Sequence, residues 1–332
     1  MKNYLLLFGT IQFLLQMNPI IGQELKTYYA ELIKEKTIDS NEEMKNSVYA
    51  DLKEESAFFV LGSENIAEKQ TAFRAGYQKN GLRIAIRCAE PEMSKIKCSK
   101  NDMENVWDDD CVEVFIWPTH AETYYHFVVN AKGSRWSGCG VDDKQEFPLA
   151  SWSAKTLKKD LFYFVEMELP WDIFLSLPQD AECWKFNIGR HGTIGGTQYT
   201  TWSALNGCFH EPDHFGKLVF AKNLPDADLR QIGKRIAPKL NDKSTEITAA
   251  VEQSCEKLQS GHINSNIIIK KIENIYKECQ SLKHRRGNGA TLKNAYAILQ
   301  EAKSLSRELD SVKIAVDEER YKLLLYKIFN DN

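Results

Sequence analysis

The residues with the clearest chemical potential form a short acidic segment. Trp107 begins this segment and Glu113 ends it, with Asp108, Asp109 and Asp110 between them. Hydrolysis of a glycosidic bond needs an acid and a base or nucleophile roughly 5–10 Å apart, which neighbouring carboxylates could supply. Consecutive acids beside a strand are also typical of a solvated turn or a cation-binding loop. The segment therefore indicates a place for chemistry without selecting a reaction.

A second pattern concerns zinc. His210, Glu211 and His214 satisfy the HExxH spacing, in which two histidines on one helix face bind zinc and the glutamate activates water. Pro212 lies inside this segment and would remove a helix hydrogen bond, and glycines flank the segment on both sides. The sequence therefore favours a loop here, and no residue set in the chain is nominated as catalytic.

The elements that must position these residues repeat with a period of two from Ser56 to about Phe220. Val112, Val114 and Ile116, for example, alternate with residues of the other face. Runs of this kind are separated by Gly, Pro and Asp, with no helical pattern between them. They predict an antiparallel β-sandwich.

After Asp226 the period becomes helical. Apolar residues spaced three and four apart are Ile268, Ile272, Ile275, Cys279 and Leu282, and then Leu305, Leu309, Val312, Val316 and Leu323. They predict a small antiparallel bundle of three to five helices, and an α+β protein as a whole. The bundle is either a packing and spacing element or a surface that docks a protein partner.

Composition divides the chain at the same point. The 332 residues exceed what one hydrophobic core usually organises. Acidic residues are in excess before Lys222 and basic residues after it, and every tryptophan lies at or before Trp202. We therefore expect a β domain over residues 23–223 and a helical domain over residues 224–332. The net charge of −3 offers no general attraction to nucleic acid.

The N-terminus predicts export. Lys2 precedes an apolar run from Leu5 to Leu15, which is too short to span about 30 Å of hydrocarbon. We interpret residues 1–22 as a cleaved signal peptide, the alternatives being an uncleaved anchor or a buried helix. No later segment approaches transmembrane length. The mature protein is expected to be secreted or periplasmic.

The chain contains eight cysteines, an even number that would allow complete disulfide pairing in an oxidising compartment. Their spacing does not assign partners. Cys111 and Cys183 lie in apolar strand patterns, so simple buried thiols are the alternative.

A set of short motifs adds to these periods. The segment from Val106 to Ile116, followed by the one from Tyr125 to Gly133, resembles family 9 carbohydrate-binding modules and the wider sugar- or haem-binding sandwich group. Supporting pieces follow in order: Thr37–Asp39, Gln70–Thr71, Val165–Pro170, Phe186–Arg190, Thr201–Ser203, Phe209–His210 and Phe215–Phe220. The resemblance covers about residues 37–221 and leaves out the helical region.

The resemblance implies a jelly-roll-like sandwich that holds a sugar ring between two tryptophans. By position, Trp107 is one of the two and Trp202 is the other. Such a clamp is physically reasonable because the C–H faces of a sugar stack on indole, whereas its hydroxyls require polar partners in the ring plane. The alternative is that either tryptophan is an ordinary core or rim aromatic.

Polar partners are expected on the outer face of the sheet. Glu113 matches the acidic residue that follows the Trp-Asp-Asp motif, and strand alternation directs Glu113, His126 and Asn130 away from the core. Arg190 ends its strand and could donate to two hydroxyls. Alternatively, Arg190 pairs with the acidic segment, and His126 is a surface histidine without a ligand.

The expected function is non-catalytic binding of an oligo- or polysaccharide. No cofactor is predicted. Family 9 modules also bind structural calcium, so the resemblance allows a calcium site, whose oxygen ligands the sequence does not assign. Two alternatives remain: a glycoside hydrolase or an accessory protein of one, and a b-type haem domain. In the second, His126 would pair with Met93, Met103 or Met167, and purified protein would show a Soret band.

Overall fold

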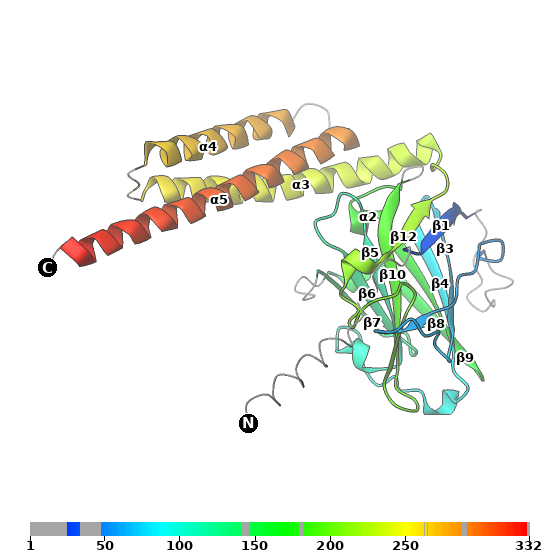
Figure 1. The fold of residues 1–332 in the computed structure, drawn as a ribbon. Coiled ribbons are helices and arrows are strands. Elements are labelled where there is room, and N and C mark those ends of the chain that lie inside the picture. The colour runs from blue at the N-terminus through cyan, green and yellow to red at the C-terminus, as the bar shows by residue number, and fades with distance from the viewer. Residues whose placement is uncertain are drawn as a thin grey trace, which may run out of the picture. The chain divides into compact units, whose positions relative to one another are not determined.

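The computed structural model describes residues 25–33, 48–140, 147–178, 182–261, 263, 265–286 and 291–330. The chain divides into two compact units, Met1–Pro225 and Asp226–Asn332. The first is built mainly of strands and the second of helices, so the predicted α+β class is confirmed (Figure 1). The predicted signal peptide and the Thr37–Asp39 motif lie outside the described residues.

The first unit contains the following strands: β1 (Thr27–Leu32), β2 (Phe59–Val60), β3 (Thr71–Gln78), β4 (Gly81–Ala89), β5 (Cys111–Trp117), β6 (Tyr125–Asn130), β7 (Arg135–Cys139), β8 (Ser153–Lys159), β9 (Phe162–Pro170), β10 (Cys183–Gly192), β11 (Gln198–Thr201) and β12 (Gly216–Phe220). Short helical turns lie between them: η1 (Met93–Lys95), η2 (Val106–Asp108), η3 (Leu149–Ser151), α2 (Trp171–Phe174) and η4 (Pro212–His214).

The strands follow the order β7-β6-β5-β10-β12-β1-β3-β4-β9-β8, with β11 beside β10 and β2 beside β11. Every pairing between these strands is antiparallel except those of β1, which runs parallel to β12 on one side and to β3 on the other. Gly76 of β3 permits this contact, because a Cβ there would lie 2.6 Å from the Ile33 side chain. The predicted antiparallel sandwich is therefore joined by one parallel strand.

Trp202 lies in the core, and its assignment as an outer tryptophan of a sugar clamp is wrong. The side chain is 0% exposed, with its ring 5.3 Å from that of Phe73 and 5.6 Å from that of Phe186. These partners belong to β3 and β10, which carry the two faces of the core. The Trp202 amide donates to the Ile188 carbonyl, and this backbone contact accompanies the inward placement of the indole.

The described part of the second unit is formed by α3 (Asp226–Gln259), α4 (Asn266–Arg286) and α5 (Leu292–Asn330), which lie side by side (Figure 1). Their shared apolar core includes the predicted positions Ile272, Ile275, Cys279, Leu282, Leu305, Leu309, Val312 and Val316. The predicted Leu323 is 40% exposed, because the buried seam of α5 ends at Val316. Among the described helices, none is long and apolar enough to span a bilayer.

The eight cysteines all lie in the described part of the chain, and all are free thiols there. Cys88, Cys111, Cys255 and Cys279 are buried. Burial raises the pKa of the Cys279 thiol to about 12, so this side chain behaves as a small apolar residue of the bundle.

Replacing the buried indole tests the placement of Trp202. Trp202→Ala should lower the free energy of unfolding by about 3–5 kcal/mol, because it leaves a cavity between the two sheets. Trp202→Phe should cost less. Denaturant titration measures both variants, with Tyr199→Ala as the control for loss of an exposed aromatic ring. A Trp202→Ala midpoint equal to that of the unmodified chain would contradict this placement.

Candidate functional site

A cavity of about 330 Å³ opens on the face of β5 and β10 that points away from the core. Glu113 and His126 lie on its floor, and Trp107 and Tyr199 contribute aromatic walls. Residues 207–210 close another side of the cavity. His191 also lines the cavity. The site therefore combines residues from four strands, a short helical turn and a loop.

The floor is formed by neighbouring strands. Glu113 of β5 pairs with Val128 of β6, two residues from His126, so both side chains emerge on the same face. The His126 Nε2 atom lies 2.9 Å from a Glu113 carboxylate oxygen. The His126 ring stacks on Phe115 with a centroid separation of 4.2 Å. The structure thus brings Glu113 and His126 together as an almost buried polar pair.

The walls are connected by His191. Its Nδ1 donates a hydrogen bond of 2.6 Å to the Trp107 carbonyl, and its ring stacks on Tyr199 at a centroid separation of 4.7 Å and an angle of 17°. Since a carbonyl only accepts, Nδ1 carries the proton and Nε2 is an acceptor. Nε2 is buried and has no partner in the described structure. His191 therefore fixes the Trp107 backbone and the Tyr199 ring together.

Trp107 occupies the exposed side of an aromatic pair. Its half-buried ring meets Trp136 of β7 edge to face, with centroids 5.1 Å apart. The Trp136 ring also contacts His126, with a centroid separation of 5.4 Å. Trp107 is thus held in place by buried neighbours while one part of its surface lines the cavity.

The loop over the cavity depends on a glycine. Phe209 packs against Phe115 and meets the Tyr199 ring edge to face, with a separation of 5.8 Å. Gly189 of β10 lies beneath it, and a Cβ at this position would come within 2.9 Å of the Phe209 ring. A larger residue at position 189 would therefore displace the loop from the strand.

Glu211 stabilises the same loop from inside. Its carboxylate accepts hydrogen bonds from the backbone amides of Asn206, Gly207 and Cys208 at 2.7–3.0 Å. Burial alone would raise the pKa of Glu211, but these amides outweigh it and keep the pKa below its ordinary value. The loop therefore carries an ionised carboxylate whose role is local.

Neither the zinc pattern nor a pairing of Met167 with His126 is assembled from these residues. His210, Glu211 and His214 do not share a helix, because residues 212–214 form a single 3₁₀ turn. Within the described residues, no group of three or more His, Cys, Asp or Glu side chains could hold a metal ion. Met167 is buried in the core of β9, whereas His126 faces away from the core.

The acidic segment is largely structural. Asp109 accepts hydrogen bonds from the Lys100 amide, the Ser99 hydroxyl and the Asn130 amide group at 2.8–3.1 Å. Asn130 also donates to the Lys100 carbonyl and is completely buried. Its assignment as a sugar contact is therefore wrong. Because the loop that contains Lys100 covers it, Asn130 holds that loop on β6 and does not line the cavity.

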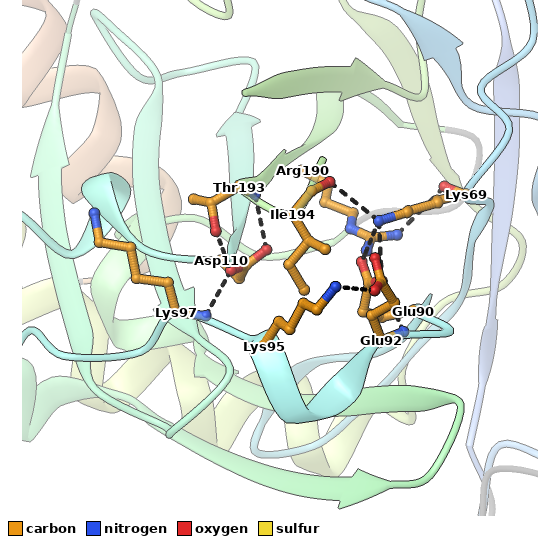
Figure 2. A network of polar contacts seen from close by, with 9 residues as sticks. All are labelled: Lys69, Glu90, Glu92, Lys95, Lys97, Asp110, Arg190, Thr193 and Ile194. Carbon is orange, nitrogen blue, oxygen red and sulfur yellow. Dashed lines mark hydrogen bonds and ion pairs between the residues drawn. The ribbon is translucent and has the colours of Figure 1, made fainter. Parts of the chain in front are cut away.

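Arg190 faces the other side of the sheet, so its assignment as a sugar contact is also wrong. Its register partner is Val112, a core residue, and alternation directs its side chain inward. There it lies 3.4 Å from the Glu90 carboxylate and over the Tyr163 ring. Lys69 binds the same carboxylate at 2.9 Å (Figure 2). The acid that pairs with Arg190 is thus Glu90, which lies outside the acidic segment.

The polar network in Figure 2 anchors the chain on both sides of His191. Arg190 and its partners hold the preceding position. After it, Asp110 accepts hydrogen bonds from the Thr193 amide and hydroxyl at 3.0 and 2.6 Å, and from the Lys97 amide. Lys69 also donates to the Ile194 carbonyl. These contacts fix the backbone that carries His191 into the cavity.

Comparison with known proteins shows that part of the sequence resembles a known family. Residues 59–162 match carbohydrate-binding family 9. The predicted resemblance is thereby confirmed over this segment. The family 9 segment contains Trp107, Glu113 and His126, whereas His191 and Tyr199 follow it. No curated protein matches the sequence of the chain.

Three solved structures resemble the chain. A proposed carbohydrate-binding protein from Bacteroides uniformis ATCC 8492 has 19% identity and a TM-score of 0.48, covering 59% of this chain and all of its own. A family 9 module from Caldicellulosiruptor kristjanssonii in complex with glucose has 13% identity and a TM-score of 0.47, and the match covers 60% of this chain and 98% of that chain. A family 9 module from the same organism in complex with cellotriose has 14% identity and a TM-score of 0.46, and the match covers 61% of this chain and 97% of that chain.

The acidic segment makes stability depend on pH. Burial alone would raise the pKa of Asp109, but the amides of Lys100 and Ser99 and the side chain of Asn130 outweigh burial and keep this pKa below its ordinary value. A carboxyl with a lowered folded-state pKa stabilises the fold above its unfolded pKa and loses this contribution as the pH falls. Asp109→Asn should therefore cost about 1.5–3 kcal/mol near neutral pH.

Urea midpoints measured near neutral pH and at about pH 3 check this expectation. The gap between the unmodified chain and Asp109→Asn should narrow on acidification, whereas Asp160→Asn in the exposed β8–β9 turn should follow the unmodified chain. A gap that stays constant across this range would argue against the role of Asp109.

Proposed function

We propose that the first unit binds carbohydrate in this cavity without catalysing a reaction. The observation that carries the proposal is the arrangement around His191, which joins the Trp107 segment to the Tyr199 ring beside a floor of Glu113 and His126. Aromatic rings offer apolar surfaces for the C–H face of a sugar, and the polar floor offers partners for its hydroxyls.

The size and composition of the cavity agree with this ligand class. A volume of about 330 Å³ is at the lower end of the range of roughly 300–1,000 Å³ for ligand sites, and it suits one or two sugar rings. Tyr199 is 43% exposed and Trp107 is half-buried, so both retain surface for a ligand. The family 9 match over residues 59–162 supports the same class of ligand.

In this proposal, Tyr199 takes the place that the sequence suggested for Trp202. Trp107 remains one aromatic contact, and Tyr199 becomes the second because it lines the cavity and stacks on His191. Glu113 accepts hydrogen bonds from sugar hydroxyls, with His126 holding its carboxylate. The ligand is an oligo- or polysaccharide, or a sugar released from one.

The two aromatic walls can be tested directly. A glycan array on the full chain first identifies a binding sugar, and calorimetry then measures its affinity for each variant. Trp107→Ala and Tyr199→Ala should each weaken binding about tenfold or more, equivalent to about 1.4 kcal/mol. Trp117→Ala removes a half-buried aromatic outside the cavity lining and should bind like the unmodified chain. Unchanged affinity in both wall variants would refute the proposed site.

We also propose that the protein acts outside the cytoplasm, as the N-terminal segment predicts. The apolar run Leu5 to Leu15 and the following residues fit a cleaved signal peptide. N-terminal sequencing of protein recovered from an expressing bacterium should then begin close to Gln23. Recovery of the intact chain from the cytoplasm alone would contradict export. We further propose that the helices of the second unit bind a protein partner.

A further inference from the structure

The cavity is lined by two acidic side chains, and His126 lies beside one of them. Among the lining residues that the structure describes, Asp108 and Glu113 are the carboxylic acids, and none is a lysine or an arginine. Lys100 approaches Asp108 at 3.5 Å, but both side chains are partly exposed and the pair is open to solvent screening. Glu113 is almost buried, so its carboxylate acts through less water.

Several hydrogen-bond donors around the cavity are already occupied. The amides of Gly207 and Cys208 donate to Glu211, and the Nδ1 of His191 donates to the Trp107 carbonyl. What remains at His191 is the acceptor Nε2, without a partner in the described structure. Glu211 adds an ionised carboxylate behind the loop. These contacts occupy three donors near the cavity, and the carboxylates of Asp108 and Glu113 remain in its lining.

Such a lining favours one class of sugar substituent. A protonated amino group offers three donors and no acceptor, a hydroxyl offers one donor, and a carboxylate offers acceptors only. Hydrogen bonds between charged partners are also stronger than neutral ones. The faces of Trp107 and Tyr199 add an attraction for a cation that they do not offer to an anion.

We propose that the cavity prefers a protonated amino sugar to its neutral counterpart and rejects the corresponding uronic acid. Glu113 is the principal determinant, because it is the buried carboxylate of the lining. Asp108 contributes less because Lys100 partly offsets its charge. This inference rests on the proposed function of the cavity and specifies its ligand class.

Matched sugars provide the test. Calorimetry on the full chain near neutral pH compares glucosamine with glucose and glucuronate, galactosamine with galactose and galacturonate, and mannosamine with mannose. In the set that binds, the amino sugar should bind about tenfold more tightly than the neutral sugar. The uronate should bind most weakly. Raising the salt concentration from roughly 0.05 to 0.5 M should remove only the smaller contribution of the partly exposed Asp108, because screening weakens exposed charge interactions far more than buried ones.

Variants assign the preference to its residue. Glu113→Gln keeps the shape and an acceptor for His126 but removes the charge, so it should bring amino and neutral sugars to nearly equal affinity. Asp160→Asn makes the same change in net charge in an exposed turn and should keep the preference. Retention of the full preference by Glu113→Gln would overturn the role of Glu113.

The outcomes separate the two proposals. A neutral sugar that binds as well as its amino counterpart, or better, overturns the amino-sugar inference and leaves carbohydrate binding intact. If no sugar of any set binds, and the glycan array is also empty, carbohydrate binding fails and the inference fails with it.

Discussion

The hydrogen bond from His191 to the Trp107 carbonyl joins the two segments on which the cavity depends. One segment lies at the end of β10 and the other forms the turn η2, about 80 positions earlier in the chain. Neither segment alone presents more than one wall. The same imidazole supports the Tyr199 ring, so a single side chain sets the relation between backbone and aromatic surface on both sides.

This arrangement explains why the acidic segment is so dense. Asp109 and Asp110 each accept hydrogen bonds from backbone amides of neighbouring loops, and both residues are completely buried. Buried carboxylates persist where several donors compensate for lost hydration. Only the flanking Asp108 and Glu113 reach the cavity. The segment therefore divides its acids between holding the loops and meeting a ligand.

Alternation along a strand predicts on which side of the sheet each side chain lies, and this rule identifies part of the candidate site from the sequence. It correctly places Glu113 and His126 together, since neighbouring antiparallel strands keep their faces in register. The same rule, applied to β10, would have turned Arg190 inward and His191 outward, because Val112 opposes Arg190. Position at the end of a strand is a weaker guide than parity here, and only parity identifies His191 as an outward residue.

Other features depend on contacts that no local pattern encodes. Trp202 follows a short strand and turns into the core through a backbone contact with β10, so its motif position suggested a surface role that the ring does not have. Tyr199 was missed because β11 is only four residues long and shows little alternation. In the bundle, the apolar spacing predicted the buried positions up to Val316, where the seam ends.

The parallel pairing of β1 with β12 places the first and last described strands of the first unit next to each other. Because Thr27–Ala30 pair with Lys217–Phe220, this ladder is a contact of long sequence separation, which is the kind of contact that slows folding. Domains whose terminal strands are adjacent tolerate insertion into a longer polypeptide and circular permutation, because neither change requires the core to reorganise.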